Sequence, residues 1–140
     1  MEYDTSEVFL DNELAGTTVA AHDSDVIDLR AAGGAGRNQP RLLIKVRTSI
    51  TSGGAATVAF RLLESDNSDG SSGDEVAGTV TGDIGKATLV AGYTVLDIVL
   101  PRTSKRYLVL EQENKTAALT GGAFDAMLTG AVDHSAKSLA

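Results

Sequence analysis

The sequence predicts an all-β fold, an antiparallel β-sandwich or jelly roll of about eight strands. Residues 41–128 contain one alternating, β-branched run after another, and the side chains of a strand alternate between two faces. Gly, Ser and Asn interrupt these runs at a spacing near ten residues, which is typical of sandwiches and barrels. No stretch of comparable length has a helical period. We therefore expect a single domain over residues 1–140, large enough to bury a core.

Composition narrows the classes of function. The chain has 12 Lys and Arg against 19 Asp and Glu, and its formal charge of −7 opposes binding to nucleic acid. It has no cysteine, which excludes a disulfide framework and a thiolate metal site. The N-terminus is acidic, and the apolar runs are far shorter than a membrane span. These features predict a soluble protein that is made in a cytoplasm and does not bind a membrane.

The N-terminal part of the chain has short and irregular patterns. Residues 1–16 contain an apolar patch without a sustained period, and we interpret them as an arm or an edge segment. Residues 17–21 and 25–29 resemble two short strands around a His-Asp-Ser turn. The following Gly-rich segment, residues 31–40, is expected to be a surface loop.

The central part of the chain predicts a hairpin. Residues 41–50 and 56–64 are two matched strands separated by a Gly-Gly turn. Alternation assigns Leu42, Ile44 and Val46 to one face of the first strand, with Lys45 and Arg47 on the other. In the second strand, it places Val58, Phe60 and Leu62 together.

The remaining strands are separated by polar segments. Residues 65–74 form a polar, Gly-rich loop that we expect to be mobile. The short polar tail, residues 132–140, is expected to fray. Further strands are predicted at 75–81, 87–90, 93–100, 106–112 and 123–129.

The loop at residues 65–70 partly matches a calcium-binding pattern. When Gly70 is aligned with the turn glycine of an EF-hand, Asn67 and Asp69 occupy ligand positions. However, Ser65 stands where the first Asp is needed, and Val76 stands where the bidentate Glu is needed. We therefore predict a solvated loop and no metal site.

Other candidate sites are equally incomplete. His22 and His134 each have Ser and Asp nearby, but a nucleophile–base pair is defined by geometry, and two histidines without cysteine are a poor zinc set. Asn114 begins a glycosylation sequon, which without a secretion signal we interpret as a hairpin turn. The sequence therefore predicts no catalytic residues and no cofactor.

Three basic residues, Arg102, Lys105 and Arg106, cluster beside Pro101. Two interpretations stay open for this cluster. It could be a rim patch that contacts an acidic partner, or it could be the solvated end of a strand. Basic residues interleaved with aromatic ones, as in proteins that stack on bases, are absent.

Several sequence blocks occur in a distinctive order. The last third of the chain has ATLVAGY at 87–93, VLP at 99–101, KRYLVL at 105–110 and TGGAFDA at 120–126. Earlier blocks are VIDL at 26–29, a Gly-Arg-x-x-Pro motif at 36–40 and SGGAATV at 52–58. In order and spacing, these blocks resemble the jelly-roll cement, or head decoration, proteins of tailed, mostly short-tailed, bacteriophages.

The resemblance implies a non-enzymatic structural protein on the capsid exterior of a virion. It would bind the outer face of the shell where major capsid protein subunits meet and reinforce their contacts. It would act there as a homo-oligomer, with a dimer favoured over a trimer. Many modest contacts suffice when many copies engage the shell together. The positions of Arg37, Pro40, Arg106 and Tyr107 match the family and look architectural.

We expect partner contacts in the N-terminal arm and among the basic residues. An arm can dock by strand addition or by apolar contact. We therefore predict that a deletion of residues 1–10 leaves the fold intact but weakens capsid attachment. The expected interface residues are Tyr3, Val8, Phe9, Leu10, Arg37, Arg102 and Arg106.

Two rival functions come from other classes. A receptor- or carbohydrate-binding β-sandwich of a virion usually needs aromatic platforms or a calcium site, whereas this chain has no Trp and only a defective calcium motif. A small hydrolase or isomerase on a jelly roll would need several converging histidines and a carboxylate, and the two histidines are far apart in the sequence.

Overall fold

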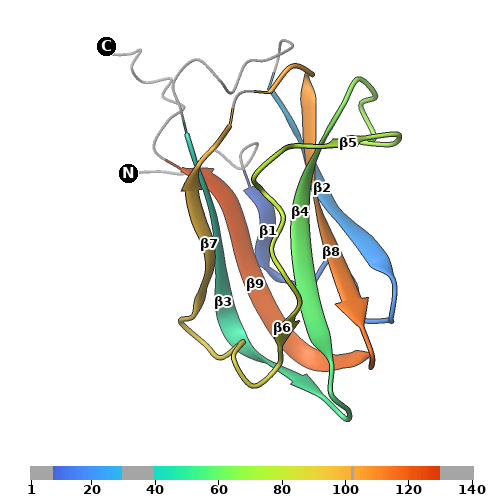
Figure 1. Cartoon of the computed structure of the whole chain (residues 1–140), viewed down its shortest axis with the longest axis vertical. Coiled ribbons are helices and arrows are strands. Elements are labelled where there is room, and N and C mark those ends of the chain that lie inside the picture. Colours follow the sequence, from blue (N-terminus) through green and yellow to red (C-terminus); the bar gives the residue numbers. More distant parts are fainter. Residues whose placement is uncertain (1–7, 30–39, 102, 130–140) are drawn as a thin grey trace.

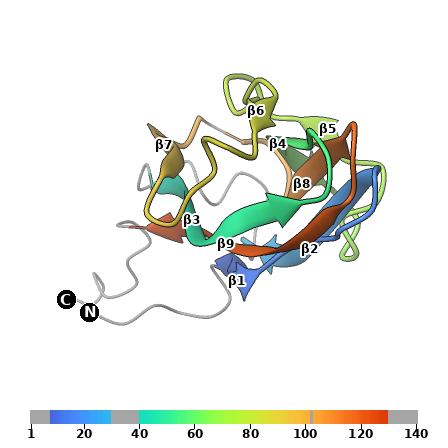
Figure 2. The same ribbon diagram turned by 90° about the horizontal axis from the view of Figure 1, so that it is seen from below.

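The computed structural model describes residues 8–29, 40–101 and 103–129. Figure 1 and Figure 2 show two antiparallel sheets packed face to face, with no helix in the described part of the chain. The predicted β-sandwich is therefore confirmed. Three predictions concern segments that lie wholly or mostly outside the described residues: residues 1–7, the 31–40 loop and the 132–140 tail.

Nine strands occur in the described residues. They are β1 (Val8–Glu13), β2 (Ala21–Asp28), β3 (Arg41–Ser52), β4 (Thr57–Ser65), β5 (Asp74–Glu75), β6 (Ile84–Gly85), β7 (Thr94–Val99), β8 (Tyr107–Lys115) and β9 (Leu119–Thr129).

The strand order is that of a jelly roll. One sheet has the order β1-β9-β3-β7, and the other has β2-β8-β4-β5, with β6 also paired to β4. The antiparallel pairs β1 with β9, β2 with β8, β3 with β7 and β4 with β5 nest inside one another along the sequence. Such nesting means that one long antiparallel ribbon has been wound into two facing sheets.

The core lies between the two sheets, and the alternation of side chains fills it as the sequence predicts. The inward residues of β3, β4 and β9 are buried: Leu42, Ile44, Val46, Val58, Phe60, Leu62, Phe124, Ala126 and Leu128. Phe60 and Phe124 come from opposite sheets and meet edge to face, with ring centroids 4.9 Å apart. This geometry is favourable for aromatic pairs and joins the two layers.

The predicted hairpin at Gly53-Gly54 is wrong, although both of its strands exist. β3 pairs with β7 and β9 in the four-stranded sheet, whereas β4 pairs with β8, β5 and β6 in the other sheet. The link between β3 and β4 therefore crosses from one sheet to the other. A Gly-rich link can make either connection, so the local sequence could not separate them.

The N-terminal segments also differ from the expectation. Residues 8–13 form β1, an edge strand on β9, and Phe9 and Leu10 lie in the core at 0% and 2% exposure. The edge interpretation is correct for these residues, but Phe9 and Leu10 are not a free arm. Of the two strands predicted at 17–21 and 25–29, the first is wrong, because residues 17–20 are not in a strand; a single strand, β2, begins at Ala21, and its pairing shifts between Asp23 and Val26. A bulge there takes the place of the predicted turn.

The free edge of β4 is covered by an irregular segment instead of the predicted strand at 75–81. On the edge of β4 that faces away from β8, only the short strands β5 and β6 pair regularly, one at each end of β4. Between them, the hydroxyl oxygens of Thr79 and Thr81 accept hydrogen bonds from the backbone N–H groups of Leu62 and Phe60, at 3.1 and 2.9 Å. These side chains replace the missing carbonyl partners, so the edge stays paired without a continuous strand.

Residues 87–90 form a turn rather than a strand. The N–H of Thr88 donates to the carbonyl of Gly85 at 3.0 Å, and the N–H of Leu89 donates to that of Lys86 at 3.1 Å. The Leu89 side chain is fully buried, and its carbonyl accepts from the N–H of Ile50 in β3 at 2.9 Å. The apolar pattern here indicates a core anchor in a connection rather than a strand.

Candidate functional site

The outer face of the four-stranded sheet carries an apolar stripe. Val8 in β1 lies opposite Met127 in β9, and Met127 lies opposite Leu43 in β3. Val99 in β7 is the diagonal neighbour of Leu43 and is 49% exposed. The other three side chains are partly exposed. We call Val8, Met127, Leu43 and Val99 the apolar stripe; it crosses all four strands of the sheet.

Alternation along β3 explains why the stripe points away from the core. Leu42 and Ile44 are fully buried, so Leu43 between them must face outward. None of the four stripe residues belongs to the buried core cluster. An apolar patch on the outside of a sandwich is informative because a soluble protein gains nothing from exposing it.

Two ion pairs flank the stripe. The Arg41 Nε lies 2.8 Å from an Asp97 carboxylate oxygen, and the Arg47 Nη1 lies 2.8 Å from Asp125. Asp125 also accepts a hydrogen bond from the backbone N–H of Asn12 in β1. The hydrogen bond that the Arg47 guanidinium donates to Asp125 raises the pKa of Arg47. These pairs are solvent-exposed, so they order the face more than they stabilise the fold.

Lys45 is the exception among the basic residues. It lies on the outer face of β3, opposite Asp125, and is exposed. Within the described ranges it forms no hydrogen bond and no ion pair, because Asp125 is bonded to Arg47 instead. The other described Lys and Arg side chains all have protein partners: Arg41, Arg47, Arg61, Lys86, Lys105, Arg106 and Lys115.

The outer face of the other sheet is rich in carboxylates. Asp23, Glu111 and Arg61 lie opposite one another on β2, β8 and β4. Arg61 bonds Glu111 at 2.5 Å and Glu75 at 3.4 Å. The pKa of Asp23 is raised above its ordinary value, first by partial burial and then by the negative charge of Glu111.

A small open cavity of about 120 Å³ lies on this second face. Its charged groups are paired with one another, since the Lys115 Nζ lies 3.1 Å from Asp83 and 3.8 Å from Glu113. The lining residues are Ala59, Phe60, Arg61, Val80, Thr81, Asp83, Glu111, Glu113 and Lys115.

Part of this second face is covered by the 66–73 loop. Leu63 and Val109 are buried, although they lie on the outer side of β4 and β8. Two loop glycines lie close over them: a Cβ atom on Gly70 would stand 3.1 Å from Val26 Cγ2 and 3.3 Å from Val109 Cβ, and one on Gly73 would stand 3.0 Å from Leu63 Cβ. The loop therefore closes a second, smaller apolar cluster on the outside of the sandwich.

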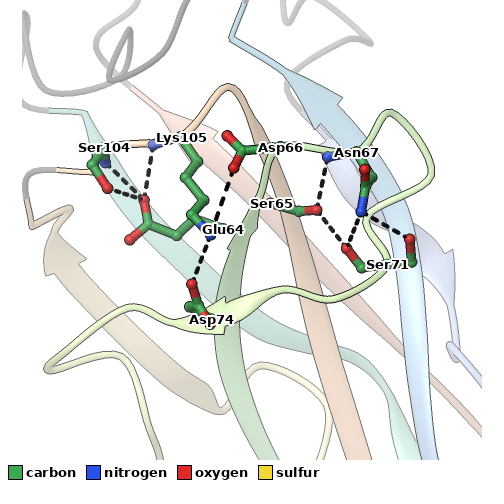
Figure 3. A network of polar contacts seen from close by, with 8 residues as sticks. All are labelled: Glu64, Ser65, Asp66, Asn67, Ser71, Asp74, Ser104 and Lys105. Carbon is green, nitrogen blue, oxygen red and sulfur yellow. Dashed lines mark hydrogen bonds and ion pairs between the residues drawn. The ribbon is translucent and has the colours of Figure 1, made fainter.

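Hydrogen bonds inside the loop hold its shape (Figure 3). The buried Ser65 hydroxyl donates to the carbonyl of Ser71 at 2.6 Å and accepts from the N–H of Asn67 at 3.0 Å. The Asn67 amide nitrogen donates to the same carbonyl at 3.0 Å, and Asp69 accepts from the N–H of Ser71 at 2.9 Å. The groups that resemble calcium ligands are thus engaged in closing the loop.

Two residues of the basic cluster at the rim, Lys105 and Arg106, are paired within the chain. Lys105 Nζ bonds Asp74 at 2.7 Å and lies 3.8 Å from Asp66, as Figure 3 shows. Arg106 makes two bonds to Asp28, at 2.7 and 2.9 Å. These hydrogen bonds raise the pKa of both basic groups. A patch that attracts an acidic partner would need free cations, and these two are engaged.

The expected interface residues lie in different environments. Val8 belongs to the apolar stripe. The Phe9 and Leu10 side chains lie in the core, where the pairing of β1 with β9 holds them, so they are not on the outer surface of the described fold, and their contact with a partner stays a prediction. Arg106 is exposed but bonded to Asp28. Tyr3, Arg37 and Arg102 lie outside the described residues.

The other candidate groups have structural roles. The Nε2 atom of His22 lies 3.0 Å from the carbonyl and 3.2 Å from the hydroxyl of Thr18 in the same turn. Asn114 is buried and donates to the carbonyls of Gly16 and Thr18, both at 3.0 Å. Its predicted turn begins at the next residues, but β8 and β9 belong to different sheets. His134 lies outside the described residues.

Sequence reasoning missed most of the apolar stripe and the unpaired state of Lys45. The signal for Leu43 was an apolar residue at an outward position of an alternating strand. Met127 and Val99 become its neighbours only through the pairing of β3 with β9 and β7. Strand register across distant segments cannot be read from a single sequence.

Comparison with known proteins gives a family. Over the described residues, no helix is long and apolar enough to span a membrane, and no group of three His, Cys, Asp or Glu side chains could hold a metal ion. No curated protein matches the chain. The model of the Bbp16 family matches residues 13–128, which is well over half of the chain. The protein belongs to the Bbp16 family.

Proposed function

We propose that this protein is a bacteriophage head decoration, or cement, protein. It binds the outer surface of the capsid and reinforces contacts between major capsid protein subunits. The observation that carries the proposal is membership of the Bbp16 family, whose name suggests a phage-related protein, over residues 13–128. That range contains all of the sequence blocks that resemble cement proteins.

The fold supports this role. A sandwich with a sealed apolar interior is a rigid body, and its function depends on its outer surface. Attachment to a shell needs a contact on the order of 1,000 Å² per copy to be specific. The outer face of a four-stranded sheet offers an extended surface of this kind. The protein acts there without catalysis or a cofactor.

The partners follow from this role. The principal partner is the major capsid protein, and copies of the chain associate as a homo-oligomer, with a dimer favoured over a trimer. The net charge of −7 disfavours nucleic acid as a ligand. The protein is made in the host cytoplasm and resides on the exterior of the virion.

A binding experiment with capsids tests the proposal. Purified protein is mixed with undecorated phage heads, and the heads are pelleted and imaged by electron microscopy. We expect saturable binding, extra density on the outer surface, and heads that withstand heat or osmotic shock better than undecorated ones. Heads that stay bare at saturating protein concentration would contradict the proposal.

A receptor- or carbohydrate-binding module of a virion is the second candidate. The observation that favours it is the open cavity of about 120 Å³ on the carboxylate-rich face, where polar and apolar side chains lie together. A glycan array separates the two functions. Specific glycan binding that is lost in Glu113→Gln would favour the module, whereas head binding without glycan binding favours the decoration protein.

A further inference from the structure

We propose that the outer face of the four-stranded sheet, formed by the apolar stripe and Lys45, is the surface that docks on the capsid shell. The surface of the shell that fits it has apolar side chains around a carboxylate. This inference rests on the proposed function and specifies which side of the sandwich meets the partner.

The apolar stripe supplies the first part of the argument. Leu43 and Met127 lie opposite each other at the middle of the sheet, with Val8 on one side and Val99 on the other. Among the described residues, these four neighbouring apolar side chains stay partly or largely exposed, and a docking partner would bury their remaining surface. Interfaces characteristically place such an apolar centre inside a polar rim. The pairs Arg41–Asp97 and Arg47–Asp125 form part of that rim.

Lys45 supplies the second part of the argument, because it specifies the chemistry of the partner. It is two residues from Leu43 on the same face of β3 and has no bonded partner in the portions of the chain that the structure describes. The cations Arg41, Lys45 and Arg47 are matched in number by the carboxylates Asp97, Asp125 and Asp11, the last of which acts on Arg47, but Lys45 is bonded to none of them. In a chain of net charge −7, this cation without a bonded partner favours an acidic group on the docking surface.

The opposite face is less suited to the same partner. Its carboxylates Asp23, Glu75, Glu111 and Glu113 outnumber the cations Arg61 and Lys115, and each of these cations already has an acidic partner. The 66–73 loop has already buried the outward apolar side chains of that sheet, Leu63 and Val109.

The edge of β7 is also less suited, because it is partly blocked. The N–H of Leu100 donates to the carbonyl of Pro40, and hydrogen-bonded and non-hydrogen-bonded pairs alternate along β3 and β7 from that point. The backbone carbonyl of Asp97 belongs to a non-hydrogen-bonded pair and therefore points away from β3. Arg41 Nη2 donates to that carbonyl at 3.2 Å. A charged side chain bound at a sheet edge opposes the addition of another strand. Docking through the face is therefore favoured over docking by strand addition.

Matched substitutions on the two faces test the inference. Leu43→Asp and Lys45→Gln change the proposed surface, and Val80→Asp and Lys115→Gln make corresponding changes at the opposite sheet, where Val80 is exposed and Lys115 is partly exposed. Affinity for undecorated heads is measured by cosedimentation. We expect Leu43→Asp to weaken binding roughly tenfold or more and Lys45→Gln roughly fivefold, with both control variants within about twofold of wild type.

The outcomes separate this inference from the proposed function. If the wild-type protein does not bind heads, the proposed function fails. If the wild type binds and all four variants bind equally well, the proposed function stands and the docking surface is wrong. A change in oligomeric state of Leu43→Asp by light scattering, with unchanged affinity for heads, would also overturn the inference and assign the stripe to a second copy. Thermal melting verifies that each variant folds, and Leu43→Ser replaces any Leu43→Asp protein that does not.

Discussion

Phe9 links the start of the described chain to the centre of the sandwich. Its ring is fully buried and belongs to the same core cluster as Phe60 and Phe124. β1 pairs only with β9, at the edge of the sheet, so contacts of Phe9 and Leu10 are its main anchors in the core. The Phe9 side chain is therefore one of the two main contacts that hold this edge strand to the sandwich.

We expect Phe9→Ala to lower the free energy of unfolding by about 3–5 kcal/mol, because it leaves a cavity in the core. Chemical denaturation followed by circular dichroism measures the change. Val90→Ala, at a side chain that is 49% exposed, is the control and should change stability by less than about 0.5 kcal/mol. A Phe9→Ala protein as stable as the control would mean that the N-terminal strand is a free arm after all.

Gly122 is a position where the backbone requires glycine. Its φ is +112°, and a Cβ atom there would lie 2.7 Å from Ile50 Cα and 2.8 Å from the carbonyl oxygen of Ser49. These neighbours are backbone atoms of β3 that cannot move aside independently. The pairing of β9 with β3 shifts around this point, between Thr48 and Thr51.

Gly122→Ala should destabilise the protein by about 1–3 kcal/mol, from left-handed backbone strain together with the clash. Gly53→Ala is the matched control, because its Cβ would meet nothing within 4 Å. Thermal melting of both variants gives the comparison. Equal melting temperatures would show that the strands separate locally at little cost.

Asp23 should make stability depend on pH in an unusual direction. Partial burial and Glu111 raise its pKa in the folded protein. The folded state then holds the proton more tightly than the unfolded chain, so this group lowers stability as the pH rises from its ordinary value through its raised value. The effect is less than about 1 kcal/mol because water screens a largely exposed side chain.

Asp23→Asn should consequently be slightly more stable than wild type at neutral pH, and the difference should shrink in acid. Urea denaturation at a series of pH values from acid to neutral measures it. Asp25→Asn, an exposed carboxylate on the same strand, is the control. A stability difference between Asp23→Asn and wild type that is the same at every pH would rule out the titration of Asp23 as its cause.

At the scale of elements, the 66–73 loop behaves as part of the fold. It covers Leu63 and Val109, and Ser65 holds its two ends together through Asn67 and Ser71. Lys105 in the 103–105 segment, just before β8, also holds this region through its ion pairs with Asp66 and Asp74. Glu64, near the end of β4, accepts hydrogen bonds from the N–H groups of Ser104 and Lys105 at 2.7 and 3.0 Å. The region around the loop is thus bonded to the segment that leads into β8.

Ser65→Ala should cost about 1–2 kcal/mol of stability, since it removes the buried hydroxyl that donates to the carbonyl of Ser71 and accepts from the partly buried N–H of Asn67. It should also speed limited proteolysis within residues 66–73, because local opening becomes easier. Ser68→Ala, at an exposed position of the same loop, is the control for both measurements. Equal cleavage rates for the two variants would mean that the Ser65 hydroxyl does not hold the loop closed.

Most strands could be predicted because their side chains alternate clearly. β3, β4, β8 and β9 have a buried face and β7 has a partly buried one, and the sequence places all five within a few residues. Near its start, β2 has His, Asp and Ser, the residues of a turn, just before and within its bulge, so the sequence predicted a turn there. The 74–85 edge could not be predicted, because threonine hydroxyls pair it instead of a backbone ladder.

The site was less predictable than the strands. Val8 was expected at an interface, but the reason given, a free arm, does not hold for β1. Leu43 and Met127 are 84 residues apart in the sequence and become neighbours only because β9 returns to lie between β1 and β3. The same nesting explains why the hairpin predicted at Gly53-Gly54 is wrong. In this jelly roll most consecutive strands, β3 and β4 among them, lie in different sheets.

At the scale of the whole molecule, the two outer faces are chemically different. The four-stranded sheet exposes the apolar stripe and Lys45, which has no bonded partner among the residues that the structure describes. The other sheet exposes carboxylates and is partly covered by the 66–73 loop. A decoration protein needs such a difference, because one side must bind the shell and the other must stay soluble toward the medium. The orientation on the capsid is therefore the central claim of the account.

Electron microscopy of undecorated heads incubated with the purified protein tests that claim most directly. We expect sandwich-shaped density at the binding positions on the outer surface, with β1, β9, β3 and β7 of each copy toward the shell and the 66–73 loop toward the solvent. Bare heads, or a density whose β2, β8 and β4 face meets the shell, would contradict it.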